Sequence, residues 1–565
     1  MGIKHFFNWF RTTYNHHIDT LYGTQSPGDR VETLALDLNG IFHPATQKAF
    51  GYGAHAPDRV SFGPPKTFRQ QQARAFREIL GTIDGLVARV RPTKRLLLCV
   101  DGVAGSAKMA QQRQRRFRRE VDTACDFDSN AITPGTEFMH SLEQFLLGVI
   151  GSRWSTLEVV FSGEKVPGEG EAKIFQYLRE SPRPERVCVV GMDADLVMLA
   201  LCAAERHAIW IFRQDSWDAN KVHWMDVSSI AREMQVPVED FVFLCFLVGN
   251  DFLPPVPGLE IKSDGIDILL RMYREACPDG IVDSKTKIPC FKSVQRLFRK
   301  MLEQHIDGDL LHLKYRKRSM YHRFPALEES CCETHVDMRE FRERYYAAKL
   351  PGCDPVAVSA EYLRGLQWVI QYYTLGMPCW SWRYPYYYAP LLVDLADPSV
   401  ACPDRRFPES APCDPFLQLL SVLPPSSARL LPPELGKIME TQEWFPESFQ
   451  LDFDGKKQDW EAIALLPWVD PEQLREAYGQ ALPTVRREHL ERNRQRGWMV
   501  FPKKSLKTAI RSENDNTRST IQSPPIPRGH HRVSEATTCR GARAAPGARR
   551  PRVPRSRAGR HFRAT

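Results

Sequence analysis

Residues 95–101 read Arg95-Leu96-Leu97-Leu98-Cys99-Val100-Asp101, a short apolar run that ends on an acid. A run of this length is typical of a strand buried on both faces of a parallel sheet. Similar runs occupy 33–37, 157–162, 186–190 and 208–213. Helical patterns fill the intervals at 67–89, 107–124, 136–148 and 169–179. This alternation predicts an α/β fold with a mostly parallel sheet and flanking helices.

Composition divides the 565 residues into four parts. The α/β pattern predicts an N-terminal domain at 1–300, and the irregular, basic segment 301–335 is expected to be a linker. A helix-rich, aromatic region follows at 336–500. Residues 501–565 are rich in Pro and Arg, and a segment with so few aliphatic side chains cannot bury enough apolar surface to fold alone. We therefore predict a disordered basic tail.

The net charge of +9 is unevenly placed. Residues 501–565 carry 16 Lys plus Arg against three acids, a net charge of +13, which leaves −4 for residues 1–500. The longest apolar run, 241–249, is too short to span a membrane, and the N-terminus has no apolar signal segment. The 14 Cys are scattered without a CxxC pair, so neither a disulfide framework nor a zinc knuckle is expected. We expect a reduced compartment, cytoplasmic or nuclear, with the cytoplasm favoured.

Acidic residues follow one predicted strand after another. Seven of them are candidate metal ligands and catalytic residues: Asp37, Asp101, Glu169, Glu171, Asp193, Asp195 and Asp251. The carboxyl ends of parallel strands meet at one edge, where so many carboxylates would repel one another unless cations lay between them. Hard divalent ions such as Mg²⁺ or Mn²⁺ take oxygen ligands, and a pair of them about 4 Å apart can promote phosphodiester hydrolysis. A single such acid is more often a turn or N-cap residue, but the repetition favours a metal-dependent site.

A basic face follows the strand that ends at Asp101. Lys108, Gln112, Arg115 and Arg116 lie at i, i+4, i+7 and i+8, within roughly one quadrant of a helix. Two guanidinium groups, an ammonium and an amide are suited to binding a phosphate. The alternative is a solvated basic helix face. Its position beside the acids favours a pocket for a terminal phosphate.

Several long motifs resemble those of the Xrn-type 5′→3′ exoribonucleases. In the first region they are Asp37-Leu38-Asn39-Gly40-Ile41-Phe42-His43 and the segments 100–104, 107–117, 132–139, 166–171, 191–196 and 249–254. In the second region they are Trp380-Ser381-Trp382-Arg383-Tyr384-Pro385 and the segments 365–369, 386–390, 417–424, 454–461 and 491–493. The resemblance runs in order over about residues 1–500.

The resemblance implies a PIN- or flap-nuclease-like catalytic domain whose seven acids bind two Mg²⁺ ions, with Mn²⁺ as an alternative. It implies that the second region completes the active-site channel and that the basic helix face holds a 5′-monophosphate. By the same resemblance, His43 and either Trp380 or Trp382 stack on the terminal bases. Without it, these three residues would more often be packed in the protein. The implied activity is processive degradation of single-stranded 5′-monophosphorylated RNA to nucleoside 5′-monophosphates in RNA decay, by a monomer.

Two other functions share some of these features. A structure-specific DNA flap nuclease would have the same acids but not the aromatic second region. A silent RNA-binding scaffold would be expected to lose carboxylates, and none is missing here. The sequence also departs from the family pattern because Gly2-Ile3-Lys4 lacks the usual proline, in a segment thought to help exclude duplex.

Overall fold

The computed structural model describes residues 3, 5–27, 31–54, 67–118, 127–215, 218, 220–320, 322–453, 455–456, 458 and 461–503. The expectations for Gly2 and Lys4, for part of the 454–461 motif and for nearly all of the tail lie outside the described residues. Within the described part, no helix combines the length and apolar character needed to cross a bilayer.

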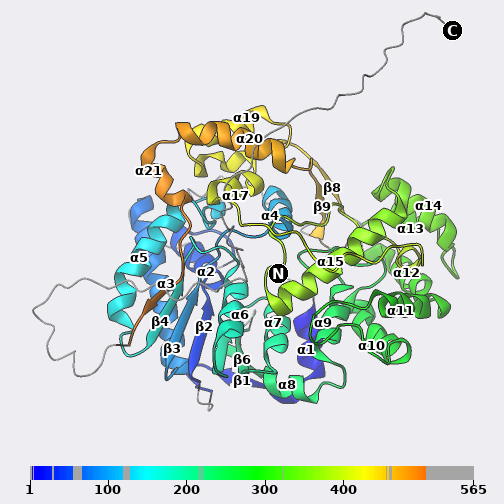
Figure 1. Cartoon of the computed structure of the whole chain (residues 1–565), viewed down its shortest axis with the longest axis horizontal. Helices are drawn as coiled ribbons and strands as arrows, with labels where there is room; N and C mark the ends of the chain where they lie inside the picture. Colours follow the sequence, from blue (N-terminus) through cyan, green and yellow to red (C-terminus); the bar gives the residue numbers. More distant parts are fainter. Residues whose placement is uncertain are drawn as a thin grey trace, which may run out of the picture. The chain divides into compact units, whose positions relative to one another are not determined.

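A single large sheet forms the centre of the described chain, in the strand order β1-β7-β6-β5-β2-β3-β4-β10 (Figure 1). Its strands are β1 (Ile18–Tyr22), β2 (Thr33–Asp37), β3 (Arg95–Cys99), β4 (Glu158–Ser162), β5 (Arg186–Val190), β6 (Ala208–Gln214), β7 (Lys221–Asp226) and β10 (Met499–Phe501). The run from β6 to β4 is parallel. On one side β7 pairs antiparallel with β6 and with the edge strand β1, and on the other side the edge strand β10 pairs antiparallel with β4. The predicted α/β fold with a mostly parallel sheet is confirmed, and each predicted strand forms. The antiparallel edge strands were not predicted.

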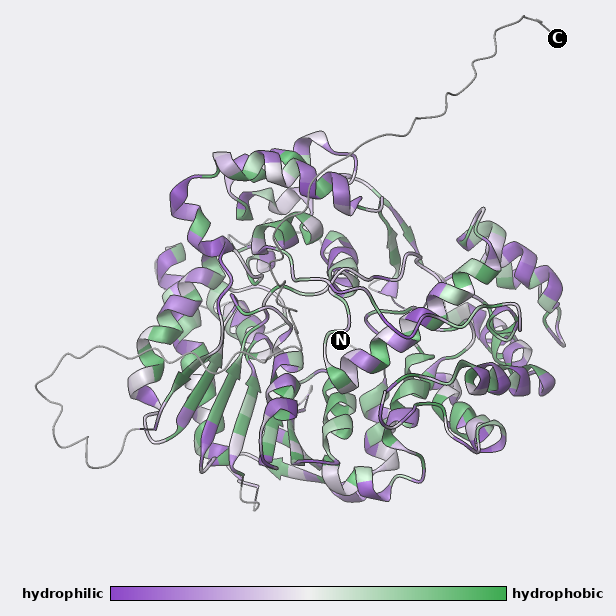
Figure 2. Cartoon of the chain, in the orientation of Figure 1, coloured by the Kyte–Doolittle hydropathy of each residue, from purple (hydrophilic) through white to green (hydrophobic). Residues whose placement is uncertain are grey.

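Helices cover both faces of this sheet because both faces are apolar. Leu97 of β3 packs into one core cluster, whereas its neighbours Leu96 and Leu98 pack into another. The first cluster is closed by α6 (Gly170–Glu180), α7 (Asp195–Ala203) and α9 (Val238–Phe246). The second is closed by α2 (Asn39–Phe50), α3 (Phe68–Val90) and α5 (Glu137–Arg153). The strands of the sheet are correspondingly hydrophobic over much of their length, with hydrophilic residues in places (Figure 2).

The remaining helices extend and complete this core. Those of the first half are α1 (Phe6–Thr13), the 3₁₀ turn η1 (Asn15–His17), α4 (Ser106–Arg118), α8 (Val227–Glu233), α10 (Gly265–Ala276), α11 (Phe291–Glu303), α12 (Ile306–Arg316) and α13 (Pro325–Glu328). Those of the second half are α14 (Met338–Lys349), α15 (Pro355–Leu375), α16 (Leu392–Leu395), α17 (Pro415–Val422), α18 (Pro433–Gly436), α19 (Ile438–Thr441), α20 (Pro471–Ala481) and α21 (Arg487–Leu490), with the small hairpin β8 (Gln450–Asp452) and β9 (Ile463–Leu465).

The two predicted regions share a core. Trp368 of α15 lies in the same hydrophobic cluster as Leu97 of the sheet, and α15 packs on α7 and α9. The strand β10 returns to pair with β4, and the described residues of both regions belong to one compact unit. The segment 301–335, expected to be a linker, contains α12 and α13 and buries Leu311 and Leu327. It is therefore packed structure, because its helices place their apolar residues on the protein side.

Candidate active site

The predicted acids lie at the carboxyl edge of the sheet, or at helix starts and in a loop beside it. They are Asp37 and Asp101 at the ends of β2 and β3, Glu169 and Glu171 at the start of α6, Asp193 and Asp195 at the start of α7, and Asp251 in the loop after α9. Each is buried or partly buried. The parallel direction of β2 to β5 brings these separate sequence positions to one edge.

These acids are close enough to perturb one another's protonation. Burial, followed by the charges of Asp101 and Asp193, raises the pKa of Asp37 well above its usual range. Burial, followed by the charge of Asp251, raises the pKa of Asp195 to about 7. Five acids from four different parts of the chain therefore form one electrostatic cluster.

Lys108 of α4 contributes positive charge to this cluster. Its Nζ lies 2.9 Å from Asp251 Oδ2 and also contacts Glu169 Oε1. Burial alone would lower the pKa of Lys108, but the charges of the surrounding acids, with Asp251 and Glu169 the largest, together outweigh burial and raise it. For Glu169 and Glu171 burial is the larger effect and raises the pKa of each, although Lys108 opposes it. Lys108 thus compensates only part of the negative charge.

Backbone groups hold the first two acids in place. The Gly170 N–H at the start of α6 donates to Asp101 Oδ1 at 2.7 Å. The Asn39 N–H donates to Asp37 Oδ1 at 3.2 Å, and the Asp101 N–H donates to Asn39 Oδ1 at 3.0 Å. A Cβ at position 170 would lie 2.5 Å from Asp37 Oδ1, so this close approach requires glycine. Asn39 was not predicted as a site residue, although it lies within the motif that begins at Asp37.

Two further positioning residues were not predicted from the sequence. The Tyr372 hydroxyl donates to Glu169 Oε2 at 2.9 Å. Lys173 Nζ donates to the carbonyls of Val100 and Gly163 at 2.7 and 2.9 Å, and burial lowers the pKa of Lys173 to about 8. Tyr372 lies one helical turn beyond an aromatic motif of the second region, but periodicity alone marks it as an ordinary core residue.

The predicted basic face of α4 points into the protein. Lys108, Gln112 and Arg116 are buried and Arg115 is partly buried. Arg116 Nη1 donates to Thr133 Oγ1 at 2.7 Å, and burial together with the charge of Arg115 lowers the pKa of Arg116 to about 9. Gln112 Oε1 is buried without a hydrogen-bond partner in the described part of the chain. The observed burial differs from what the alternative prediction, a solvated basic helix face, would require.

The structure distinguishes the two tryptophans considered for base stacking. Trp382 is 8% exposed and stacks on Trp368 at a centroid distance of 5.2 Å, as part of the core. Trp380 is partly exposed, and its carbonyl accepts the Ser106 N–H at 2.8 Å, which places it against the start of α4. His43 is partly buried on α2, one turn after the residue that bonds Asp37 and Asp101. Stacking by Trp382 would therefore require the core to open, whereas Trp380 and His43 remain candidates.

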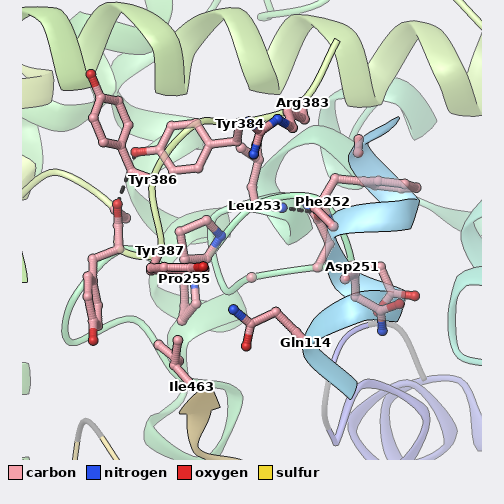
Figure 3. A pocket seen from close by; sticks show the side chains of 18 of the residues that line it. Gln114, Asp251, Phe252, Leu253, Pro255, Arg383, Tyr384, Tyr386, Tyr387 and Ile463 are labelled. Atoms are coloured by element: carbon pink, nitrogen blue, oxygen red, sulfur yellow. Dashed lines mark hydrogen bonds between the residues drawn. The ribbon is translucent and has the colours of Figure 1, made fainter. Parts of the chain in front are cut away.

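The second region supplies one wall of a cavity of about 460 Å³, and Asp251 is the one of the seven acids that lines it (Figure 3). The side of α4 carrying Gln114 lies along this cavity, with Asp251 at its edge. Tyr387 also lines this cavity and stacks on Trp468 at 4.4 Å. The second region is thus continuous with the acidic cluster and with α4, which also packs on α17 and β9.

The fold and the site define an α/β protein with a buried polyacidic centre and a basic helix beside it. Two family models match almost all of the chain: "XRN 5'-3' exonuclease N-terminus" at residues 1–125 and 119–215, and "Xrn1 helical domain" at 232–334 and 329–524. The chain belongs to the Xrn 5′-3′ exonuclease family.

Curated relatives agree with this assignment. The chain is 28% identical to human "5'-3' exoribonuclease 1", over 87% of this chain and 35% of the human protein. It is 25% identical to "5'-3' exoribonuclease 2" of Debaryomyces hansenii, over 91% of this chain and 73% of that protein. The Saccharomyces cerevisiae "5'-3' exoribonuclease 1" is 27% identical over 87% of this chain and 44% of its own length. The chain thus spans about a third of the length of the human relative.

Among solved structures, the catalytic core of Rad2 in complex with DNA substrate is similar over 65% of this chain and 95% of the Rad2 chain. The sequence identity is 14% and the TM-score is 0.31, a value that does not establish a common fold. The α/β assignment depends on the sheet of this chain itself.

Proposed function

We propose that this chain is a divalent-metal-dependent 5′→3′ exoribonuclease that releases nucleoside 5′-monophosphates from single-stranded RNA with a 5′-monophosphate. The observation that carries the proposal is the convergence of seven carboxylates beside the buried basic face of α4. The names of the relatives support the direction of cleavage, the RNA substrate and a role in RNA decay. Processive action on a single strand is part of the same proposal.

The acids suit hard divalent cations. Asp195 Oδ1 is buried and lacks a hydrogen-bond partner within the described residues, so an acceptor oxygen is left unsatisfied in the cluster. Burial and then the charges of Asp101 and Asp193 raise the pKa of Asp37, and burial raises the pKa of Glu171 although Lys108 opposes it. Carboxylate oxygens are the ligands that Mg²⁺ and Mn²⁺ prefer. We propose that two such ions are held by Asp37, Asp101, Glu169, Glu171, Asp193, Asp195 and Asp251.

When bound, such ions activate water and stabilise charge on the leaving oxygen in phosphodiester hydrolysis. The chain's own residues then position the RNA. We propose that Lys108, Gln112, Arg115 and Arg116 bind the 5′-phosphate, with Arg116 oriented by its bond to Thr133. Because this face is buried, a larger capped or triphosphorylated end would fit poorly. His43 and Trp380 would hold the terminal bases by stacking, which is indifferent to base identity.

A matched set of substrates tests the proposal. The full chain is incubated with RNAs carrying 5′-monophosphate, 5′-hydroxyl, 5′-triphosphate or cap, and with a DNA flap, in Mg²⁺ or EDTA. We expect rapid, Mg²⁺-dependent release of mononucleotides from the 5′-monophosphate RNA. Asp193→Ala should abolish hydrolysis while circular dichroism and thermal unfolding stay unchanged. Asp279→Asn, at an exposed acid after α10, is the matched control and should keep full activity.

Three results would contradict the proposal. Full hydrolysis by Asp193→Ala would contradict the assignment of Asp193 as a metal ligand. Equal cleavage of 5′-monophosphate and 5′-hydroxyl RNA by the unaltered chain would contradict the proposal that the basic face of α4 binds the 5′-phosphate. Preferred cleavage of the DNA flap would favour a flap nuclease instead.

A further inference from the structure

Two adjacent histidines and a glutamate meet on the surface, away from the acidic cluster. His16 and His17 lie on the 3₁₀ turn η1 that leads into β1, and Glu233 is the last residue of α8. β1 pairs antiparallel with β7, with Ile18 opposite Met225, and α8 follows β7 directly. Strand pairing therefore brings the turn before β1 next to α8.

This group lies at the opposite edge of the sheet from the seven acids. The end of β7 at Asp226 is opposite Trp210, near the start of β6. β6 runs parallel to β5, and it is the far end of β5 that leads to Asp193. A strand of β6's length spans roughly 20 Å at the usual rise per residue. The histidine group is thus separate from the candidate active site.

The three side chains converge on one point. His16 Nε2 lies 3.0 Å from both carboxylate oxygens of Glu233, and His17 Nε2 lies 2.6 Å from Oε2. One ligand atom from each residue lies within 4.8 Å of the other two, and no other group of three His, Cys, Asp or Glu does so within the described chain. The centroids of the two imidazole rings are 4.3 Å apart, and the ring planes are inclined at 44°.

These donors are those of a zinc-type cation. Zn²⁺ takes imidazole nitrogen and carboxylate oxygen at about 2.0–2.2 Å in a tetrahedral arrangement, which separates neighbouring ligand atoms by about 3.3 Å. The observed separations of 2.6 and 3.0 Å from the carboxylate need only small adjustments to reach that spacing. Mg²⁺ prefers oxygen ligands and has less affinity for imidazole. The side chains of His16 and Glu233 are 52% and 50% exposed, which leaves room for a water as fourth ligand.

We propose that His16, His17 and Glu233 bind one Zn²⁺ ion, which ties the N-terminal segment to α8. The alternative is a hydrogen-bonded cluster without metal, in which the imidazoles share the carboxylate. The tether would act on α1, which directly precedes η1 and buries Phe6 and Phe10 completely in the core. A ligand that binds only the folded chain stabilises it by mass action, so bound Zn²⁺ raises the midpoint of thermal unfolding.

Zinc binding is measured by calorimetry on the full-length chain. The protein is stripped with a chelator, dialysed into millimolar Mg²⁺ to load sites of oxygen ligands, and titrated with Zn²⁺. We expect one Zn²⁺-binding event that His17→Gln and Glu233→Gln each weaken about tenfold or more. Zn²⁺ should raise the unfolding midpoint of the unaltered chain and not that of either variant. RNA hydrolysis in Mg²⁺ should be unchanged in both variants, because the group lies far from the acids.

His312→Gln is the matched control, since His312 Nε2 bonds only to the Glu333 carbonyl among the contacts described, at 3.1 Å. It should bind Zn²⁺ as the unaltered chain does. Circular dichroism checks that each variant is folded. Loss of Zn²⁺ binding in both His17→Gln and Glu233→Gln would separate the loss of a ligand from a local loss of structure in one variant. Absence of Zn²⁺ binding in the unaltered chain, or an identical isotherm in all four proteins, would overturn the proposal. Neither result depends on whether the chain cleaves RNA.

Discussion

Replacing Gly170 by alanine should disturb the acidic cluster without unfolding the protein. The added Cβ would lie 2.5 Å from Asp37 Oδ1 and 3.3 Å from the Cys99 carbonyl oxygen, whereas ordinary contact begins at 3.4 Å. The Cys99 carbonyl belongs to β3 and has little freedom to move, so the Asp37 carboxylate must retreat by about 0.9 Å. Gly170 is also the residue whose backbone N–H donates a hydrogen bond to Asp101, so the substitution acts on both acids.

The size of the effect follows from this displacement. A misplacement of about 1 Å in a catalytic arrangement costs on the order of 100-fold in rate, or about 2.7 kcal/mol in the activation barrier. Stability should change little, because position 170 is the first residue of α6 and alanine favours a helix. We therefore expect kcat to fall about 100-fold with an unfolding midpoint close to that of the unaltered chain.

Single-turnover degradation of 5′-monophosphate RNA over a Mg²⁺ titration measures this effect. The displaced carboxylate should also raise the Mg²⁺ concentration needed for half-maximal rate. Gly81→Ala is the matched control, because Gly81 lies within α3 with no atom within 4 Å of an added Cβ. It should keep the full rate and gain about 0.5–1 kcal/mol of stability. A kcat for Gly170→Ala within twofold of the unaltered chain would refute the steric argument.

Other predictions test neighbouring parts of the site and core. Tyr372→Phe removes the hydroxyl that orients Glu169 and should lower kcat about tenfold without shifting the unfolding midpoint, measured by RNA degradation and calorimetry. Burial raises the pKa of Glu164 from 4.5 to about 8, so the folded state retains a proton that the unfolded state loses. Stability should therefore fall as pH rises through that window, by at most about 5 kcal/mol, and urea unfolding of Glu164→Gln should lack this slope. Trp382→Ala should cost about 3–5 kcal/mol of stability, because Trp382 is part of the core. Trp380→Ala should leave stability nearly unchanged and weaken RNA binding by about 1–3 kcal/mol. Equal effects of the two substitutions on unfolding would contradict the assignment of Trp382 to the core and of Trp380 to base stacking.

The parallel centre of the sheet was predictable because its strands are buried on both faces. Leu96, Leu97 and Leu98 are all fully buried, so the apolar run is continuous and short, which identifies a central strand. Edge strands carry a weaker signal. β1 exposes Asp19 and Thr20, and β10 has only three residues, all half-buried. Neither has a pattern that separates a strand from a loop.

The location of the acids was predictable from the sequence, because each follows a strand or begins a helix at the edge that the parallel strands share. The sequence also placed Lys108 and Arg116 on one helix face, because a helical period depends only on local spacing. The contacts of those side chains could be identified from the tertiary structure alone. Lys108 reaches Asp251, which lies 143 positions away in the chain, and Tyr372 reaches Glu169 across 203 positions. Such contacts depend on how α15 and α4 pack against the sheet, and the periodicity that marks a residue as buried does not identify its neighbours.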